Sequence, residues 1–161
     1  MKSVTSFTTE LDNAVKAAGQ LAASVGERIV LSKNAIGILL CDADMDGAAV
    51  TEELHKLLGI DIAGMTTLGT LDKDGYHEAA AVFTVLTADD CVFYAAASES
   101  LAESNFKQRI TASAKSVTPE KHGSMNGLFF AFCPNGMPFS GDTYPDMLSK
   151  ATGGVPVIGG V

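Results

Sequence analysis

Residues 35–67 read AIGILLCDADMDGAAVTEELHKLLGIDIAGMTT, and this stretch decides the fold. It opens with a continuous apolar run over 35–41, which is typical of a buried strand. Residues 47–58 then repeat apolar side chains at helical spacing, and Gly59 stands where a helix commonly ends. A second short strand is expected over 61–67. This order of strand, helix and strand predicts an α/β fold.

The same order of elements occurs a second time near the end of the chain. Residues 127–133 (GLFFAFC) predict a strand, 142–151 a short helix and 155–161 (VPVIGGV) a final strand. Cys41 and Cys133 close the first strand of each unit, 92 positions apart (133 − 41). The sequence therefore predicts an internal repeat, whose equivalent loops are expected on corresponding edges of a sheet.

Further elements are expected outside the two units. Apolar residues at helical spacing predict a helix over 8–26, capped by Thr8 or Thr9. Residues 79–86 and 91–97 read as an antiparallel hairpin because only four residues separate them, and a capping-box pattern at 100–103 opens a third helix. The predicted fold class is α/β: a mixed β-sheet flanked by helices, with two related strand–loop–helix–strand units around a central antiparallel hairpin.

Length and charge limit the classes of function. The chain has 161 residues, enough for one hydrophobic core, so we expect a single domain over 1–161. The last predicted strand ends on the final residue, which suggests a fragment of a longer protein whose C-terminal part is missing. Eleven basic and nineteen acidic residues give a net charge of −8, whereas a nucleic-acid partner requires a basic surface. We therefore expect no nucleic-acid partner.

The cysteines and the hydrophobic pattern favour the cytoplasm. The N-terminus lacks the basic and apolar regions of a signal peptide, and no apolar run reaches the roughly 20 residues of a membrane helix. We expect no membrane partner. The three cysteines have no zinc-site spacing and read as reduced thiols of a reducing compartment.

Residues 41–53 (CDADMDGAAVTEE) match the EF-hand calcium pattern. An EF-hand loop lies between two helices, whereas the residues before this loop predict a strand. In the simpler interpretation, Asp44 and Asp46 lie at a helix start and stabilise its positive end. We therefore predict no metal and no other cofactor. The alternative metal ligands are Asp42, Asp44, Asp46 and Glu53.

Residues 64–69 (GMTTLG) are the strongest candidate for contact with a small ligand. Glycines at both ends allow close backbone approach or a sharp bend, and two threonine hydroxyls could bind a carboxylate or an amide. The alternative is a glycine bulge in a bent strand. A glycine pair in the last predicted strand holds the matching place in the second unit. The candidate ligand-binding residues are Gly64, Thr66, Thr67, Gly69, Gly159 and Gly160.

The order of these stretches resembles the FIST N-terminal domain family. In that family an apolar strand and a helix lead to a "G-c-T-t-x-G" stretch, here 64–69, followed by a turn glycine, here Gly75. The second unit resembles the later section of the family, which ends in a "P-V-x-G-G" strand, here 156–160. The likeness spans 34–161, and Met65 departs from the small residue or cysteine that is more usual in the family.

The resemblance implies a cytoplasmic sensory domain without catalytic activity. Such a domain would bind a small molecule, such as an amino acid or a related carboxylate, and would signal to a downstream domain or protein. In the family a FIST C-terminal domain normally follows, and we expect it to be missing from this chain. Two alternatives stay open: a divalent-metal-dependent hydrolase that uses Asp42, Asp44 and Asp46, and an interaction scaffold that binds no ligand. Assembly into a homo-oligomer through an exposed apolar edge would favour the scaffold.

Overall fold

The structure is a computed structural model, and it describes residues 1–160 except 73–74, 102–103, 125, 134–138 and 141. The chain divides into two compact units, Met1–Ala95 and Ala96–Val161. Each unit has a hydrophobic cluster of its own.

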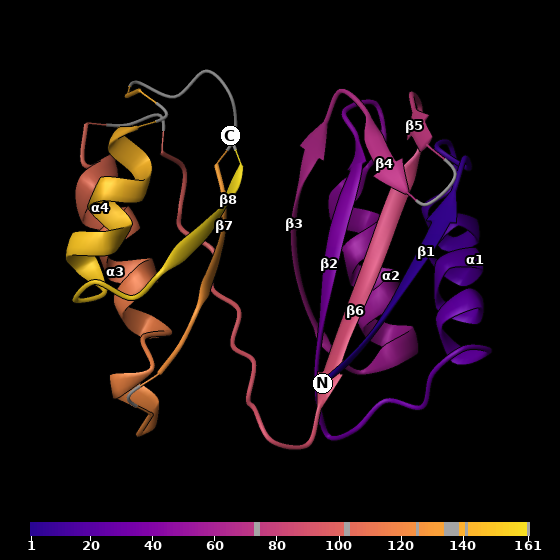
Figure 1. Cartoon of the computed structure of the whole chain (residues 1–161). Coiled ribbons are helices and arrows are strands. Elements are labelled where there is room, and N and C mark those ends of the chain that lie inside the picture. The colour runs from indigo at the N-terminus through magenta and orange to yellow at the C-terminus, as the bar shows by residue number, and fades with distance from the viewer. Residues whose placement is uncertain (73–74, 102–103, 125, 134–138, 141, 161) are drawn as a thin grey trace. The chain divides into compact units, whose positions relative to one another are not determined.

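The first unit contains a four-stranded mixed sheet of order β1-β6-β2-β3 (Figure 1). β6 (Ala81–Ala88) lies antiparallel between β1 (Lys2–Thr8) and β2 (Asn34–Asp42), and β2 pairs in parallel with β3 (Asp61–Thr67). Because β6 runs opposite to both of its neighbours, β1, β2 and β3 all run in one direction. Their carboxyl ends therefore meet at one edge of the sheet.

Two helices, α1 (Ala14–Gly26) and α2 (Gly47–Leu58), cover one face of this sheet (Figure 1). The Asn13 side chain accepts a hydrogen bond from the Lys16 backbone at the start of α1. α2 ends at Gly59, which has the left-handed conformation at φ 66°. Both helices begin at the edge where the parallel strands end, because α1 follows β1 and α2 follows β2 along the chain.

The core of the first unit lies between these helices and the sheet. Phe83 on β6 is completely buried, and its ring occupies the space over Gly37, where a Cβ would stand 2.5 Å from the ring atom Cε2. Side chains that point toward the helices on alternate strand positions complete the cluster. The most deeply buried members are Ala17, Ala18, Leu21, Val25, Leu39, Cys41, Val50, Leu54, Ala81, Phe83 and Val85.

A short hairpin lies near the carboxyl edge on the other face of the sheet, which we call the outer face. Its strands are β4 (Thr70–Asp72) and β5 (Gly75–His77), paired antiparallel. The His77 ring lies 4.4 Å from the ring of Phe7, which projects from the outer face of β1. The hairpin therefore packs on the outer face, opposite α1 and α2.

The second unit repeats the strand–helix–strand order of the first. β7 (Phe129–Phe132) is followed by α4 (Thr143–Ala151) and then by β8 (Val157–Gly160), which pairs in parallel with β7. α3 (Phe106–Ser116) and the short 3-10 helix Glu120–His122 precede them. Leu101, Ile110 and Leu148 are among the buried residues of this unit.

The predicted internal repeat is confirmed, because both units contain the order strand, helix, strand. The two pairs of parallel strands also share a feature of their register. Gly64 lies opposite Leu39 in the first unit, and Gly159 lies opposite Ala131 in the second. Leu39 and Ala131 are 92 positions apart (131 − 39), the spacing of the two cysteines. At either glycine a Cβ would stand 2.7 Å from the carbonyl carbon of the opposite residue. Both units therefore need a residue without a side chain at this point.

The α/β fold class is confirmed, as are β2, α2 and β3, but two predicted elements are wrong. The helix predicted over 8–26 begins only at Ala14, and residues 2–8 form β1. Residues 91–97, all described, form no strand, so the hairpin predicted over 79–97 does not exist. Its first strand, β6, pairs with β1 and β2 on both sides and has no free edge left.

The predicted ends of other elements differ by a few residues. α3 begins at Phe106, and part of the capping-box pattern at 100–103 lies outside the described residues. β8 is shorter than the predicted strand 155–161, whose last residue is also outside them. Within the described part of the chain, no helix combines the length and apolar character needed to cross a membrane.

Candidate functional site

The candidate site is the edge of the first unit where β1, β2 and β3 end. Thr8 lies opposite Ala81, Ala81 opposite Cys41, and Cys41 opposite Thr66, so the three strand ends are aligned across the sheet. The loops that lead into α1, into α2 and into β4 all leave from this edge. In open α/β sheets the carboxyl ends of parallel strands are the usual place for a ligand.

Two carboxylates of the acidic loop, those of Asp42 and Asp46, accept hydrogen bonds from nearby backbone N–H groups. Asp42 is the last residue of β2, and its Oδ1 accepts a hydrogen bond from the Asp44 backbone at 2.9 Å. Asp46 caps α2, because its Oδ1 accepts from the Ala49 backbone at 3.0 Å. The sequence prediction that an acid at this corner caps the helix is thus met by Asp46.

Glu53, the last acid of the calcium pattern, lies one and a half turns into α2. Its carboxylate pairs with Lys56 Nζ at 2.8 Å on the surface of the helix. Within the described residues, no group of three or more histidine, cysteine or acidic side chains comes together to hold a metal ion. The element before the loop is β2, so the loop lacks the first helix of an EF-hand.

The structure brings the acidic loop and the GMTTLG stretch together. Thr67 lies directly opposite Asp42 in the β2–β3 register. The Thr67 hydroxyl accepts a hydrogen bond from the Gly69 backbone at 2.9 Å and donates to the Gly69 carbonyl oxygen. Thr66 is exposed and points to the helix-covered face, near the start of α2 at Gly47.

Three glycines of the candidate stretches, Gly64, Gly69 and Gly159, lie where a side chain would meet a neighbour. Gly64 meets the Leu39 backbone, as described above, and Gly69 lies under the aromatic ring of Tyr76, where a Cβ would stand 2.5 Å from the ring atom Cζ. Gly159 and Gly160 lie in β8 opposite Ala131 and Phe132, within the second unit. The two glycine stretches thus belong to different units.

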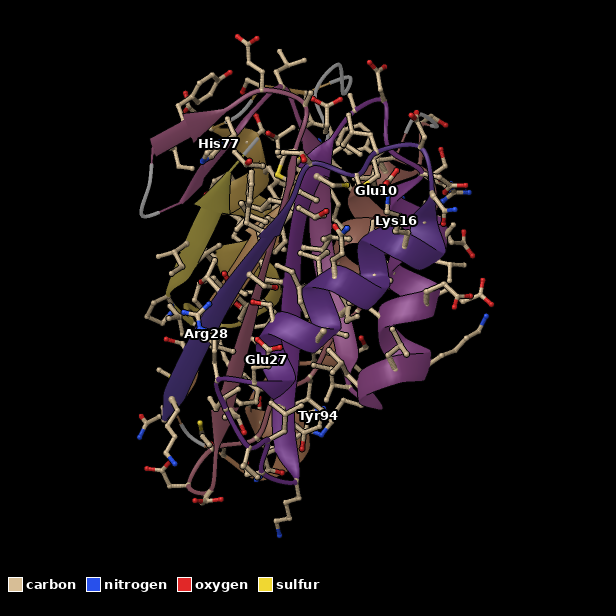
Figure 2. The ribbon with its side chains drawn as sticks, turned by 90° about the vertical axis from the view of Figure 1, so that its right-hand side faces the viewer. Glu10, Lys16, Glu27, Arg28, His77 and Tyr94 are labelled. Atoms are coloured by element: carbon tan, nitrogen blue, oxygen red, sulfur yellow. The ribbon has the colours of Figure 1, made fainter. Side chains whose placement is uncertain are left out.

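The structure adds a feature that the sequence analysis missed at the same edge. A polar hollow of about 440 Å³ lies between the end of β1 and the start of α1. Figure 2 shows two of its residues, Glu10 and Lys16, close together, and Lys16 Nζ lies 2.5 Å from the Glu10 carboxylate. The hollow is lined by Thr9, Glu10, Leu11, Asp12, Lys16 and Gln20.

Two of the charges of this hollow, those of Glu10 and Lys16, neutralise each other, whereas Asp12 adds a negative charge. The hydrogen bond from Lys16 holds the pKa of Glu10 below its ordinary value, and the same bond raises the pKa of Lys16. A continuous helix over 8–26 would have left no room for such a turn. The signal that could have revealed it is Asn13, a preferred N-cap residue that follows the predicted caps Thr8 and Thr9.

Two buried thiols occupy equivalent positions in the repeat. Cys41 is the last residue but one of β2, and Cys133 directly follows β7. Burial raises the pKa of both thiols, and for Cys41 the neighbouring Asp42 adds to the effect. Neither thiol is therefore poised as a nucleophile, since the reactive form is the thiolate.

The comparison with known proteins identifies the family. The family model of the FIST N domain matches residues 35–161, that is 127 of the 161 residues (161 − 35 + 1). No curated protein and no solved structure matches the chain. The matched segment begins at β2 and runs through both units, whereas β1 and α1 precede it. The predicted single domain over 1–161 stays a prediction. The chain belongs to the FIST family, as a FIST N domain.

Proposed function

We propose that this chain is a cytoplasmic, non-catalytic sensory domain that binds a small ligand at the carboxyl edge of β1, β2 and β3. Membership of the FIST family is consistent with a sensory role in signal transduction. The observation that carries the proposed location is the register of Asp42 opposite Thr67, which places the acidic loop beside the GMTTLG stretch. Ligand binding at this edge would produce a signal that is transmitted to a downstream signalling domain or protein.

The chemistry of the edge favours a ligand with an ammonium group. Asp42 and Asp44 bring negative charge to the end of β2, and the half-buried carboxylate of Asp42 is best matched by a cation. The start of α2 would attract a carboxylate, but Asp46 already occupies it. An amino acid, which carries an amine, therefore fits this edge better than a carboxylate without one.

A thermal-shift screen with amino acids tests the proposal. A ligand at a hundred times its Kd adds about 2.7 kcal/mol to the free energy of unfolding. For a unit of this size that is a rise of about 11 to 22 °C in the unfolding midpoint. Each amino acid is compared with its deaminated carboxylic acid, which should have no effect. The proposal fails if no amino acid raises the midpoint at millimolar concentration.

A pair of matched variants locates the binding. Asp42→Asn removes the charge at the candidate edge, whereas Asp61→Asn makes the same change at the amino end of β3. We expect the first to lose the response to the amino acid and the second to keep it. Equal responses in both variants would contradict the proposed location.

The metal-dependent hydrolase stays an alternative with a test of its own. Calorimetry with calcium, magnesium and manganese compares the wild-type chain with Asp44→Ala. A heat of binding that only the wild type shows would support the hydrolase and count against the sensory proposal.

A further inference from the structure

The two edges of the four-stranded sheet differ in how they are protected. β1 forms one edge, and the guanidinium group of Arg28 donates a hydrogen bond to the Thr5 carbonyl oxygen there at 2.6 Å. Figure 2 shows the Arg28 side chain beside β1. Lys2 adds a second positive charge at the start of this strand. Charged side chains on an edge strand keep other strands from pairing with it, so the β1 edge is blocked.

β3 forms the other edge and carries no such protection. Its sequence, DIAGMTT, has one charged residue, Asp61, at its first position, and contains no proline. Among the described residues, no side chain is hydrogen-bonded to the backbone of this strand. A long, uncharged and uncovered edge is a template on which another strand can pair.

The backbone groups on the open side of β3 can be identified from the ladder. The Asp42 amide donates to the Ala80 carbonyl oxygen, on the side of β2 that faces β6. Backbone groups alternate along a strand, so the odd-numbered residues of β2 bond to β3, and the odd-numbered residues of β3 bond to β2. The N–H and C=O groups of Ile62, Gly64 and Thr66 therefore point away from the sheet.

We propose that two copies of this chain pair through β3, antiparallel and related by a two-fold axis at Gly64. In this register Ile62 pairs with Thr66 of the partner subunit, and Gly64 pairs with Gly64 of the partner subunit. All the outward backbone groups of both strands then find partners. Any other register within Asp61–Thr67 leaves at least one of the three residues unpaired.

The occupant of this edge is a second copy because the strand is complementary to itself. Asp61 lies opposite Thr67 of the partner subunit, so no like charges meet. On the outer face, Ala63 and Met65 are half-buried, and each lies opposite the other across the two-fold axis. Because each copy carries a net charge of −8, close approach requires a locally neutral surface, and β3 provides one.

The antiparallel arrangement places the two candidate edges at opposite ends of the joined sheet. The acidic loop of each copy therefore stays uncovered, and pairing does not require a ligand. Assembly through an apolar edge would by itself suggest a scaffold, but this arrangement is equally compatible with a sensory domain. The inference thus goes beyond the proposed function, and its test is separate from the ligand screen.

Sedimentation velocity of the full chain over about 10 µM to 1 mM measures the assembly, because a single strand pair is a small interface and should bind weakly. The mass expected at the upper end is close to twice the 16.7 kDa of one chain. Over the same range, amide hydrogen exchange of Ile62, Gly64 and Thr66 should slow, whereas that of β1 should not change. A chain that stays monomeric up to about 1 mM overturns the inference and leaves the edge to a strand of another protein.

Two double variants test the register. Ala63→Lys/Met65→Lys places lysine opposite lysine of the partner subunit and should abolish the dimer. Ala63→Lys/Met65→Glu introduces as many charged side chains but places lysine opposite glutamate, so it should dimerise at least as well as the wild type. The control is Ser3→Lys, which adds a lysine at an exposed position of β1 and should leave the dimer intact.

The results that contradict the inference are distinct. Equal dimerisation of the two double variants would place the contact elsewhere on the chain. Loss of the dimer in both, with circular dichroism unchanged from the wild type, would refute the register. Loss of the dimer in Ser3→Lys would point to β1 instead of β3. If the double variants do not fold, the wild type decides: exchange rates at Ile62, Gly64 and Thr66 that do not fall with rising concentration overturn the inference.

Discussion

Gly64→Ala should separate β3 from β2 and unfold the first unit at a much lower temperature. Gly64 lies opposite Leu39, and an added Cβ would stand 2.7 Å from the Leu39 carbonyl carbon and 3.0 Å from its nitrogen. Ordinary contacts of a Cβ are 3.4 Å or longer. Both partners are backbone, so no side-chain rotation can relieve the overlap, and the two strands have to move apart.

The expected loss of stability is about 3 kcal/mol. Overpacking of a well-ordered structure costs about 1–3 kcal/mol. Each ladder hydrogen bond that the separation weakens adds about 1 kcal/mol. For the 95 residues of the first unit, a loss of about 3 kcal/mol lowers the unfolding midpoint by about 12 to 24 °C.

Urea unfolding followed by circular dichroism measures this loss, and two variants serve as controls. Gly19→Ala also adds a methyl group, but no described atom lies within 4 Å of the new Cβ on α1. It should stabilise the chain by about 0.5–1 kcal/mol through its helix propensity. Gly159→Ala repeats the clash in β8, so hydrogen exchange should show loss of protection in the second unit only.

If the free energy of unfolding of Gly64→Ala lies within about 1 kcal/mol of the wild-type value, the reasoning is refuted. Strands that are this close together have to move apart to accommodate an added methyl group, and that movement should cost more. If amide protection were lost equally in both units, that result would contradict the division into two units that each have a hydrophobic core of their own.

Other predictions concern thiols, charge and the core. Ellman's reagent should modify Cys91 quickly and the buried Cys41 and Cys133 slowly, and Cys91→Ser should remove the fast phase; two fast thiols would be inconsistent with the described burial. The lowered pKa of Glu10 implies stability that is present above its ordinary pKa of 4.5 and is lost as the pH falls below it. Between the wild type and Glu10→Gln, the free energy of unfolding of the variant should therefore fall less as the pH is lowered. Identical curves for the two proteins would contradict the ion pair. Phe83→Ala should cost about 3–5 kcal/mol in urea unfolding, and a loss below about 1 kcal/mol would mean that the ring is not the centre of the core.

The segment from β2 to the end of α2 was predictable from the sequence because its local signals agree with one another. The apolar run of β2, the capping acid Asp46 and the terminal glycine Gly59 each indicate the same boundaries that the structure has. β1 was missed because its inward positions include Ser6 and Thr8, so no apolar alternation marks it. These hydroxyls are satisfied by long-range partners, the Phe83 carbonyl for Ser6 and the Gln20 side chain for Thr8.

The candidate site was predictable in its residues but not in its geometry. The sequence analysis weighed the acidic loop and GMTTLG as separate possibilities, and only the strand register places Asp42 opposite Thr67. The burial of Thr70 on β4 depends on how the hairpin packs against the outer face, and no spacing along the chain encodes that packing. Register and packing arise from pairings between distant segments, so single-sequence patterns do not fix them.

The central place of β6 has a consequence for the order in which the first unit folds. Among the described strands β1 pairs only with β6, and their paired residues are separated by 73 to 85 positions (81 − 8 and 87 − 2). During synthesis, β2, α2 and β3 can associate as soon as they emerge, because their contacts are local. The first strand to be made must wait until residue 88 has left the ribosome, so the N-terminal segment is the last part of its sheet to find a partner.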